Sequence, residues 1–156
     1  MTSFDLTDVH NFVLMTPRIA TSGQPTREQF QAIAQAGYGA VINLAMPDSE
    51  RAVRDEGALV ADQGMFYFHI PVPFAAPLPE HVRVFCDLLR GLEMTTDRKI
   101  WVHCILNYRV SAFVYHYLTK IQAVPEDAAR SPIFERWQPD PVWSDLLRWD
   151  REKIGV

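Results

Sequence analysis

The stretch Lys99-Ile-Trp-Val-His-Cys-Ile-Leu-Asn-Tyr-Arg-Val-Ser111 decides the predicted fold of this chain. It starts with a short apolar run, residues 100–102, of the kind that forms a fully buried strand. After Cys104, the apolar residues take the spacing of one helix face: Val110, Phe113, Val114, Tyr117, Leu118 and Ile121. The stretch therefore predicts a strand, a tight loop that begins at Cys104, and a helix that begins near Arg109.

Such a loop turns backbone N–H groups and a helix N-terminus toward one point, and this arrangement binds anions. The same surroundings favour the thiolate form of a cysteine, which is its nucleophilic form. We therefore predict covalent chemistry on a phosphate or sulfur substrate, with Cys104 as the nucleophile. The predicted anion-binding residues are Ile105, Leu106, Asn107, Tyr108 and Arg109.

A family resemblance supports this interpretation. His103-Cys104 followed by Arg109 and Ser111 resembles the signature loop of cysteine-dependent tyrosine and dual-specificity phosphatases, which reads His-Cys, five residues, Arg, then Ser or Thr. Further matches are Thr21-Ser-Gly-Gln-Pro-Thr26, Val41-Ile-Asn-Leu44 and Ile70-Pro-Val72. They make the chain similar to a bacterial family of small phosphatase-like domains, found alone or fused to a metallo-β-lactamase-type hydrolase. The resemblance covers about residues 11–120 and implies phosphomonoester hydrolysis through a Cys104 phosphoenzyme, without cofactor or metal.

The loop departs from the phosphatase pattern in its spacing. Four residues, not five, separate Cys104 from Arg109, although Ser111 still follows Cys104 by seven positions. Either the loop is one residue shorter, or the arginine has moved one place toward the cysteine. The usual glycine is also absent, and Asn107 is expected to adopt the left-handed backbone in its place.

The general acid is the second departure. In related phosphatases, an aspartate on a neighbouring loop protonates the leaving oxygen, and the corresponding position here is Pro73. Ligands of open α/β sheets lie beyond the carboxyl ends of the strands. The loop after Leu44 is expected to lie at this edge of the sheet, beside the loop after His103. We therefore expect Asp48 to be the acid, with Glu50 and Glu80 as alternatives.

Other side chains are expected to support this site. His103 is predicted to order the loop through hydrogen bonds rather than to titrate in the chemistry. Ser111 either hydrogen-bonds the Cys104 sulfur or caps the helix. Tyr108 and Phe74 are candidates for the rim of a pocket for an aromatic substrate.

Three functions stay open. The first is a cysteine-dependent phosphatase, atypical in its spacing and acid, and faster on aryl than on alkyl phosphates because aryl leaving groups need less protonation. The second is a rhodanese-like sulfurtransferase with a persulfide on Cys104, because the four-residue spacing resembles that of rhodanese loops. The third is a catalytically impaired module that binds an anionic or phosphorylated ligand.

The rest of the chain predicts an α/β fold with a mainly parallel central sheet and helices on both faces. Expected strands cover residues 12–15, 18–21, 40–44, 65–70 and 100–103, and expected helices cover 26–37, 50–63, 79–93 and 110–121. Cys86 is expected to pack in the core. A C-terminal helical extension spans about residues 125–154, with a last helix from Asp140-Pro141 through Lys153, and its Trp137, Trp143 and Trp149 are expected to cover the edge of the core.

Length and composition limit the remaining possibilities. A chain of 156 residues predicts one domain, residues 1–156. A net charge of −4 without a basic stripe argues against a nucleic-acid partner. No apolar run is long enough to span a membrane and no signal peptide is visible, so a cytoplasmic location is expected. Expected partners are phosphate-bearing or other anionic small molecules, or a phosphoprotein; the oligomeric state is not predicted.

Overall fold

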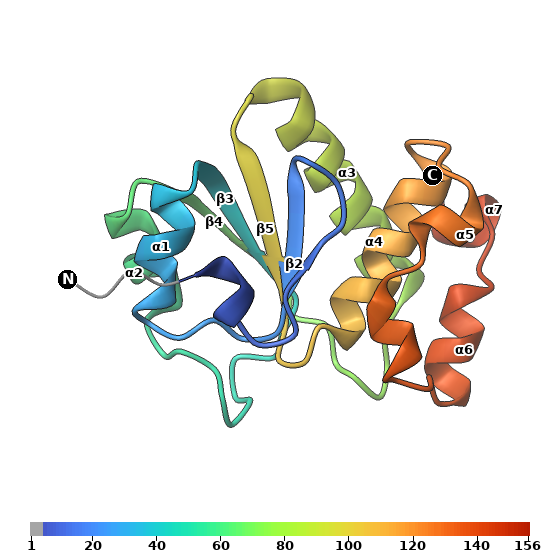
Figure 1. Ribbon diagram of the computed structural model, residues 1–156. Helices are drawn as coiled ribbons and strands as arrows, with labels where there is room; N and C mark the ends of the chain where they lie inside the picture. The colour runs from blue at the N-terminus through green and yellow to red at the C-terminus, as the bar shows by residue number, and fades with distance from the viewer. Residues whose placement is uncertain (1–4) are drawn as a thin grey trace.

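A five-stranded sheet in the order β1-β2-β5-β3-β4 forms the centre of the computed structural model, which describes residues 5–156 (Figure 1). Strands β2, β5, β3 and β4 are parallel, and the short β1 pairs antiparallel with β2 at one edge. The mainly parallel sheet predicted from the sequence is thereby confirmed. The strands are β1 Val13–Leu14, β2 Ile19–Ser22, β3 Tyr38–Asn43, β4 Phe66–His69 and β5 Lys99–His103.

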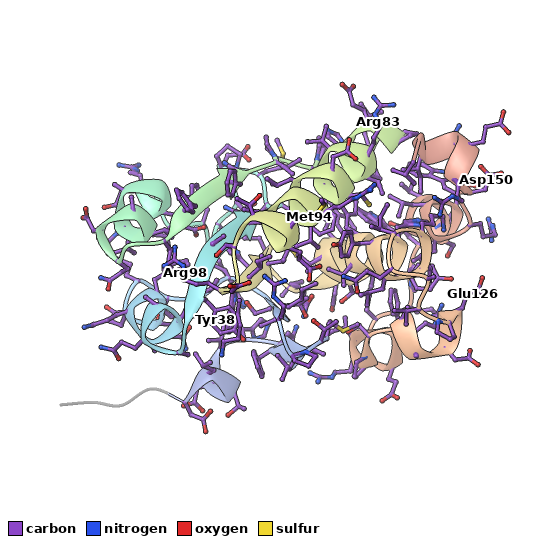
Figure 2. The ribbon with its side chains drawn as sticks, turned by 90° about the horizontal axis from the view of Figure 1, so that it is seen from above. Tyr38, Arg83, Met94, Arg98, Glu126 and Asp150 are labelled. Carbon is purple, nitrogen blue, oxygen red and sulfur yellow. The ribbon has the colours of Figure 1, made fainter. Side chains whose placement is uncertain are left out.

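Helices cover both faces of this sheet (Figures 1 and 2). On one face lie η1 Leu6–Asp8, α1 Gln29–Gln35 and α2 Glu56–Asp62. On the other face lie α3 Pro79–Thr95 and α4 Tyr108–Lys120. The C-terminal elements pack outside α4; they are α5 Glu126–Ala129, η2 Pro132–Glu135, α6 Pro141–Leu147 and α7 Arg151–Ile154.

The central strand β5 divides the interior into two cores. Its Trp101 packs in the core under α1 and α2, with Phe30 among its neighbours. Ile100 and Val102 pack in the larger core under α3 and α4. Successive side chains of a strand point to opposite faces, so a strand covered on both faces must be apolar throughout. This requirement explains the Ile-Trp-Val run and places the end of β5, with Cys104, between the two helical layers.

Several local predictions are confirmed. Thr26 and Gln29 exchange the expected capping hydrogen bonds, with Thr26 N 3.0 Å from Gln29 Oε1 and Gln29 N 3.3 Å from Thr26 Oγ1. Cys86 on α3 is fully buried in the core, and burial raises the pKa of its thiol to about 12.

Two predicted helices have wrong boundaries. The helix expected from residue 50 begins only at Glu56, because residues 46–52 form hydrogen-bonded turns, with Ser49 N bonded to Met46 O and Ala52 N to Ser49 O. The single last helix is in fact α6 and α7. They separate at residues 148–150, where the extended Asp150 caps α7 by accepting from Lys153 N at 2.8 Å.

Candidate active site

The segment from β5 to α4 has the strand–loop–helix form expected from the sequence. Cys104 is its first residue, and α4 begins at Tyr108. Asn107 just before α4 has φ 70° and ψ 9°, which is the predicted left-handed conformation. Its side-chain Nδ2 donates to Asn11 O at 2.8 Å and to Thr21 Oγ1 at 3.0 Å. These two hydrogen bonds fix the turn into α4 against the β1–β2 end of the sheet.

The loop carbonyls point away from the concave side of the loop. Ile105 O accepts from Gln24 N at 3.0 Å, and Leu106 O accepts from Asn11 Nδ2 at 2.9 Å. Gly23 permits this approach, because a Cβ there would lie 2.4 Å from Ile105 O. Within residues 5–156, no oxygen accepts from the backbone N–H groups of residues 105–110. A row of unpaired N–H groups at a helix N-terminus is suited to an anion.

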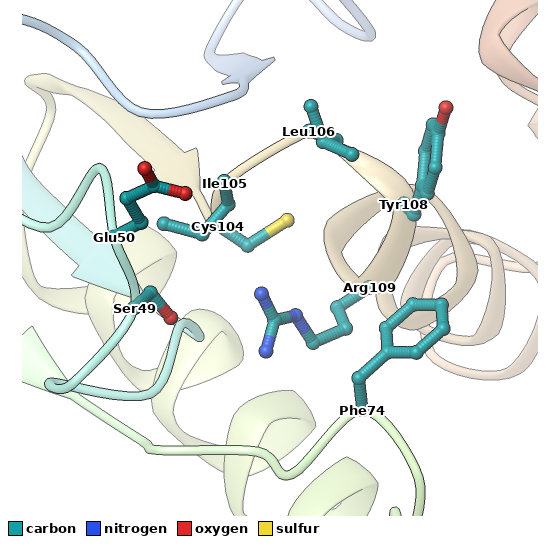
Figure 3. Close-up of a pocket in the computed structure, with 8 residues that line it drawn as sticks. All are labelled: Ser49, Glu50, Phe74, Cys104, Ile105, Leu106, Tyr108 and Arg109. Carbon is teal, nitrogen blue, oxygen red and sulfur yellow. The ribbon is translucent and has the colours of Figure 1, made fainter.

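A pocket of about 430 Å³ opens over this loop (Figure 3). Cys104 lies at its base, with a side chain only 1% exposed. In Figure 3 the Arg109 guanidinium extends toward the same part of the pocket as the Cys104 sulfur. The lining residues are Ser49, Glu50, Phe74, Cys104, Ile105, Leu106, Tyr108 and Arg109.

Arg109 reaches the pocket from the first turn of α4. Helix side chains tilt toward the N-terminus, so an arginine at this position extends back over the loop. Its Nη1 donates to Val72 O at 3.0 Å, and its guanidinium lies 5.8 Å from the centre of the Phe74 ring. Val72 and Phe74 belong to the loop after β4, so contacts from this loop orient the Arg109 guanidinium in the pocket. The four-residue spacing therefore brings Cys104 and Arg109 into one pocket.

His103 orders the start of the loop, as its position suggested. Its Nδ1 lies 3.0 Å from Cys104 O, and its Nε2 lies 2.6 Å from Oε2 of Glu56 on α2. Gln24 Nε2 donates to the other Glu56 oxygen at 2.7 Å. Burial raises the pKa of Glu56, but His103 and the hydrogen bonds from Gln24 and Tyr67 lower it by more. The net effect is a pKa below the usual value of a glutamate.

Ser111 lies behind the loop and is 1% exposed. Its hydroxyl donates to Asn107 Oδ1 at 3.1 Å. Two roles were expected for Ser111, a hydrogen bond to the Cys104 sulfur or a contact that stabilises the start of the helix. The observed hydrogen bond is of the second kind, because its acceptor Asn107 directly precedes α4.

The candidate acids separate in the structure. Asp48 is exposed in a turn and is not among the residues that line the pocket, and Glu80 is exposed in the first turn of α3. Glu50, two residues after Asp48, does line it. The turns at residues 46–52 explain this difference, because they replace the regular helix that was expected to start at residue 50.

The C-terminal tryptophans reach the pocket walls. Trp137 stacks on Tyr108 with ring centres 4.7 Å apart, and Trp143 stacks on Phe74 at 5.2 Å. Sequence reasoning placed these tryptophans at the edge of the core and did not predict this contact. It also missed Glu56, Gln24 and Asn11, since the sequence around each carries no signal for a partner in the loop. The sequence marks the Ser22-Gly-Gln24 segment only through the family resemblance.

The chain matches the family described as "Polymorphic toxin system, DSP-PTPase phosphatase" over residues 17–120. The chain belongs to this phosphatase family. The matched region contains the four parallel strands β2 to β5, the Cys104 loop and α4. It ends before the C-terminal helices. A comparison with functionally curated proteins gives no match.

Solved structures of the same fold agree with the family. A DUF442 phosphatase from Shewanella putrefaciens CN-32 is 34% identical, with 91% of each chain covered and a TM-score of 0.79. Tk-PTP is 16% identical over 88% of this chain and 94% of its own, with a TM-score of 0.73. TpbA of P. aeruginosa, in a complex with phosphotyrosine, is 16% identical over 98% and 91%, with a TM-score of 0.70. The last two show likeness of fold alone.

No helix among residues 5–156 is long and apolar enough to cross a membrane. In the same residues, no three or more His, Cys, Asp and Glu side chains gather as a metal ion would require.

Proposed function

We propose that this protein is a cysteine-dependent phosphatase that prefers aryl phosphomonoesters. One observation carries the proposal: Cys104 and Arg109 line the same pocket, above backbone N–H groups that no oxygen of residues 5–156 accepts from. A phosphoryl group carries charged oxygens that such donors stabilise, and they act most strongly on the charge that develops in the transition state.

In the first step, the Cys104 thiolate attacks phosphorus, and the bond from phosphorus to the leaving oxygen breaks. The loop N–H groups and Arg109 hold the other phosphoryl oxygens, with Arg109 directed by its bond to Val72 O. Glu50, from the edge of the pocket, gives its proton to the leaving oxygen. In the second step, a water that loses its proton to Glu50 attacks phosphorus and releases phosphate and the thiolate.

The walls of the pocket favour an aryl group. Beyond Cys104 and Arg109 the lining is mostly apolar, with the Phe74 and Tyr108 rings on the side of α4. TpbA was crystallised with phosphotyrosine, so a phosphotyrosine peptide is a suitable probe beside a simple aryl phosphate. Phosphoserine is the matched alkyl probe.

The first experiment is hydrolysis of an aryl phosphate by the purified protein, beside Cys104→Ser. We expect turnover that disappears in the variant, and slower turnover of phosphoserine. Equal rates on the aryl and alkyl esters would contradict the aryl preference. Turnover that survives Cys104→Ser would contradict Cys104 as the nucleophile.

Sulfur transfer is the second candidate, and only the four-residue spacing favours it. Incubation with thiosulfate, followed by intact-mass measurement, tests it directly. A mass gain of one sulfur atom that Cys104→Ser abolishes would support a persulfide. Binding of inorganic phosphate without turnover of any ester would instead indicate a non-catalytic anion-binding module.

A further inference from the structure

Asn11, which lies just before β1, holds two neighbouring residues of the Cys104 loop. Its side-chain Nδ2 donates to Leu106 O at 2.9 Å, and its main-chain oxygen accepts from Asn107 Nδ2 at 2.8 Å. We propose that Asn11 is a positioning residue that holds the peptide group between Leu106 and Asn107 with its N–H toward the phosphate site. This inference rests on the proposed function only in that the pocket binds a phosphate group.

The direction of the Leu106 carbonyl determines the direction of the next N–H. In a trans peptide group the C=O and N–H bonds point in opposite directions, and no peptide bond among residues 5–156 is cis. The Leu106 carbonyl faces Asn11 on the outer side of the loop. The N–H of Asn107 therefore faces the concave side, where the pocket opens over Cys104. Because no oxygen of residues 5–156 accepts from this N–H, it is available to a phosphoryl oxygen.

The preceding peptide group of the loop has the same orientation but a different donor. Ile105 O accepts from the main-chain N–H of Gln24 at 3.0 Å, so the N–H of Leu106 also faces the concave side. A side-chain substitution cannot remove a main-chain donor, whereas it can remove the amide of Asn11. Of these two neighbouring N–H groups, only that of Asn107 depends on a side chain for its direction.

The partners of the Asn11 amide allow it only one orientation. Arg136 Nη1 lies 3.1 Å from Asn11 Oδ1, and an arginine side chain only donates. The Leu106 carbonyl only accepts, so the NH₂ group of Asn11 must face it. Arg136 belongs to the C-terminal segment beyond residue 120, so this segment also contributes to the orientation of the loop.

The main chain around Asn11 is attached to the sheet. Gly23 N, at the end of β2, donates to His10 O at 2.7 Å. The ring of Phe12 stacks on Trp101 of β5, with ring centres 5.5 Å apart. Asn11 itself has φ 53°, in the left-handed region that asparagine tolerates better than most residues. The amide therefore reaches the loop from a fixed position.

Loss of the Asn11 amide should weaken the binding of phosphate. The Leu106 carbonyl would lose its donor, and the peptide group could then turn. A turned group would present a carbonyl oxygen to the pocket, and this oxygen repels the oxygens of a phosphate. Loss of one donor to a charged oxygen typically weakens binding by about ten- to a hundredfold.

The first test is a ¹H–¹⁵N NMR titration of the unmodified protein with inorganic phosphate. We expect the amide protons of both Leu106 and Asn107 to move downfield, because each donates to a charged oxygen of the bound ion. If the Asn107 proton does not move downfield, the proposal is overturned, whether or not the Leu106 proton moves. This arm needs no variant of Asn11.

The second test is the same titration of Asn11→Gly. Glycine adopts a positive φ without strain, so the variant loses the amide and keeps the main-chain oxygen that accepts from Asn107. We expect the downfield shift of Asn107 to disappear, that of Leu106 to remain, and the Kd for phosphate to rise about tenfold or more. An unchanged shift of Asn107 in this variant would reduce Asn11 to a structural role and overturn the proposal.

Thr16→Ala is the matched control. Thr16 Oγ1 accepts from Arg18 N at 3.1 Å and from Ile19 N at 3.0 Å, in the turn between β1 and β2. This turn precedes β2, whereas the Cys104 loop lies beyond the other end of that strand. The control should therefore keep both amide shifts and the original Kd. If it raises the Kd as much as Asn11→Gly does, a general loosening of β1 and β2 explains the effect, and the proposal fails.

Neither titration requires turnover. If the protein binds phosphate but hydrolyses no phosphate ester, the proposed function fails while the titrations still decide the role of Asn11. Conversely, an active phosphatase whose Asn107 amide does not respond to phosphate would retain its function and refute only this inference.

Discussion

The indole of Trp137 lies parallel to the ring of Tyr108, with ring centres 4.7 Å apart and an interplanar angle of 1°. Trp143 supports Phe74 in a similar way, because it stacks on the ring and its Nε1 donates to Phe74 O at 2.8 Å. Both tryptophans lie beyond residue 120, where the family match ends. The C-terminal segment therefore buttresses two walls of a pocket whose base comes from the family region.

Trp137→Leu tests this support. Loss of the stacked ring leaves Tyr108 free to move, so KM for an aryl phosphate should rise about three- to tenfold. Inhibition by inorganic phosphate should change little, because the proposed phosphate contacts are the loop N–H groups and Arg109, which the substitution leaves in place. Steady-state kinetics measure both. Trp149→Leu is the control, since Trp149 Nε1 bonds to the exposed Asp145 and its ring does not line the pocket. An equal rise of KM in Trp137→Leu and Trp149→Leu would contradict a specific role of Trp137 in supporting the pocket.

Asn107 can be tested by a pair of substitutions. Asn107→Ala keeps a side chain at φ 70° and loses the hydrogen bonds to Asn11 and Thr21, so it should lower the free energy of unfolding by about 2–4 kcal/mol. Asn107→Gly loses the same bonds without the strain, so it should cost about 1 kcal/mol less. Urea unfolding of both variants measures the difference. Equal losses would mean that the backbone conformation contributes nothing.

These residues show what the sequence could and could not predict. The Cys104 loop, the left-handed Asn107 and α4 depend on local patterns, such as apolar spacing and the tolerance of asparagine for positive φ. The residues that hydrogen-bond to the loop cannot be predicted from such local patterns. Glu56 is 47 residues from His103, and Asn11 is 96 from Asn107, so no local pattern links them. Only the fold brings them together.

The choice between Asp48 and Glu50 shows the same limit at shorter range. Both carboxylates follow β3 within a few residues, and both suit the first turn of a helix by composition. Which one faces the pocket depends on the turns at residues 46–52, and their geometry follows from packing rather than from residue type.

In the proposed mechanism Glu50 is the general acid, and Glu50→Gln removes it. The loss should slow hydrolysis of an alkyl phosphate by about 10²-fold or more, and hydrolysis of a nitrophenyl phosphate much less, since nitrophenolate needs little protonation to leave. The dependence of kcat on the leaving group, measured over a series of aryl phosphates, should become steeper. Asp48→Asn is the matched control and should leave the series unchanged. If Asp48→Asn has the larger effect, Glu50 is not the acid.

The burial of His116 predicts that the free energy of unfolding depends on pH. Its pKa is lowered by burial from 6.5 to about 4 in the folded protein, so between these values the unfolded chain binds a proton that the folded chain does not. The contribution of His116 is therefore complete above about pH 6.5, falls as the pH drops toward 4, and levels off below it. At about 1.4 kcal/mol for each pKa unit, the loss amounts to roughly 3 kcal/mol. Urea unfolding at pH 7 and pH 4 should show this loss in the unmodified protein and a clearly smaller one in His116→Gln. The exposed His10→Gln should behave as the unmodified protein does. If His116→Gln loses as much stability on acidification as the unmodified protein, proton uptake by other groups accounts for the pH dependence, and the neutral buried histidine contributes nothing to it.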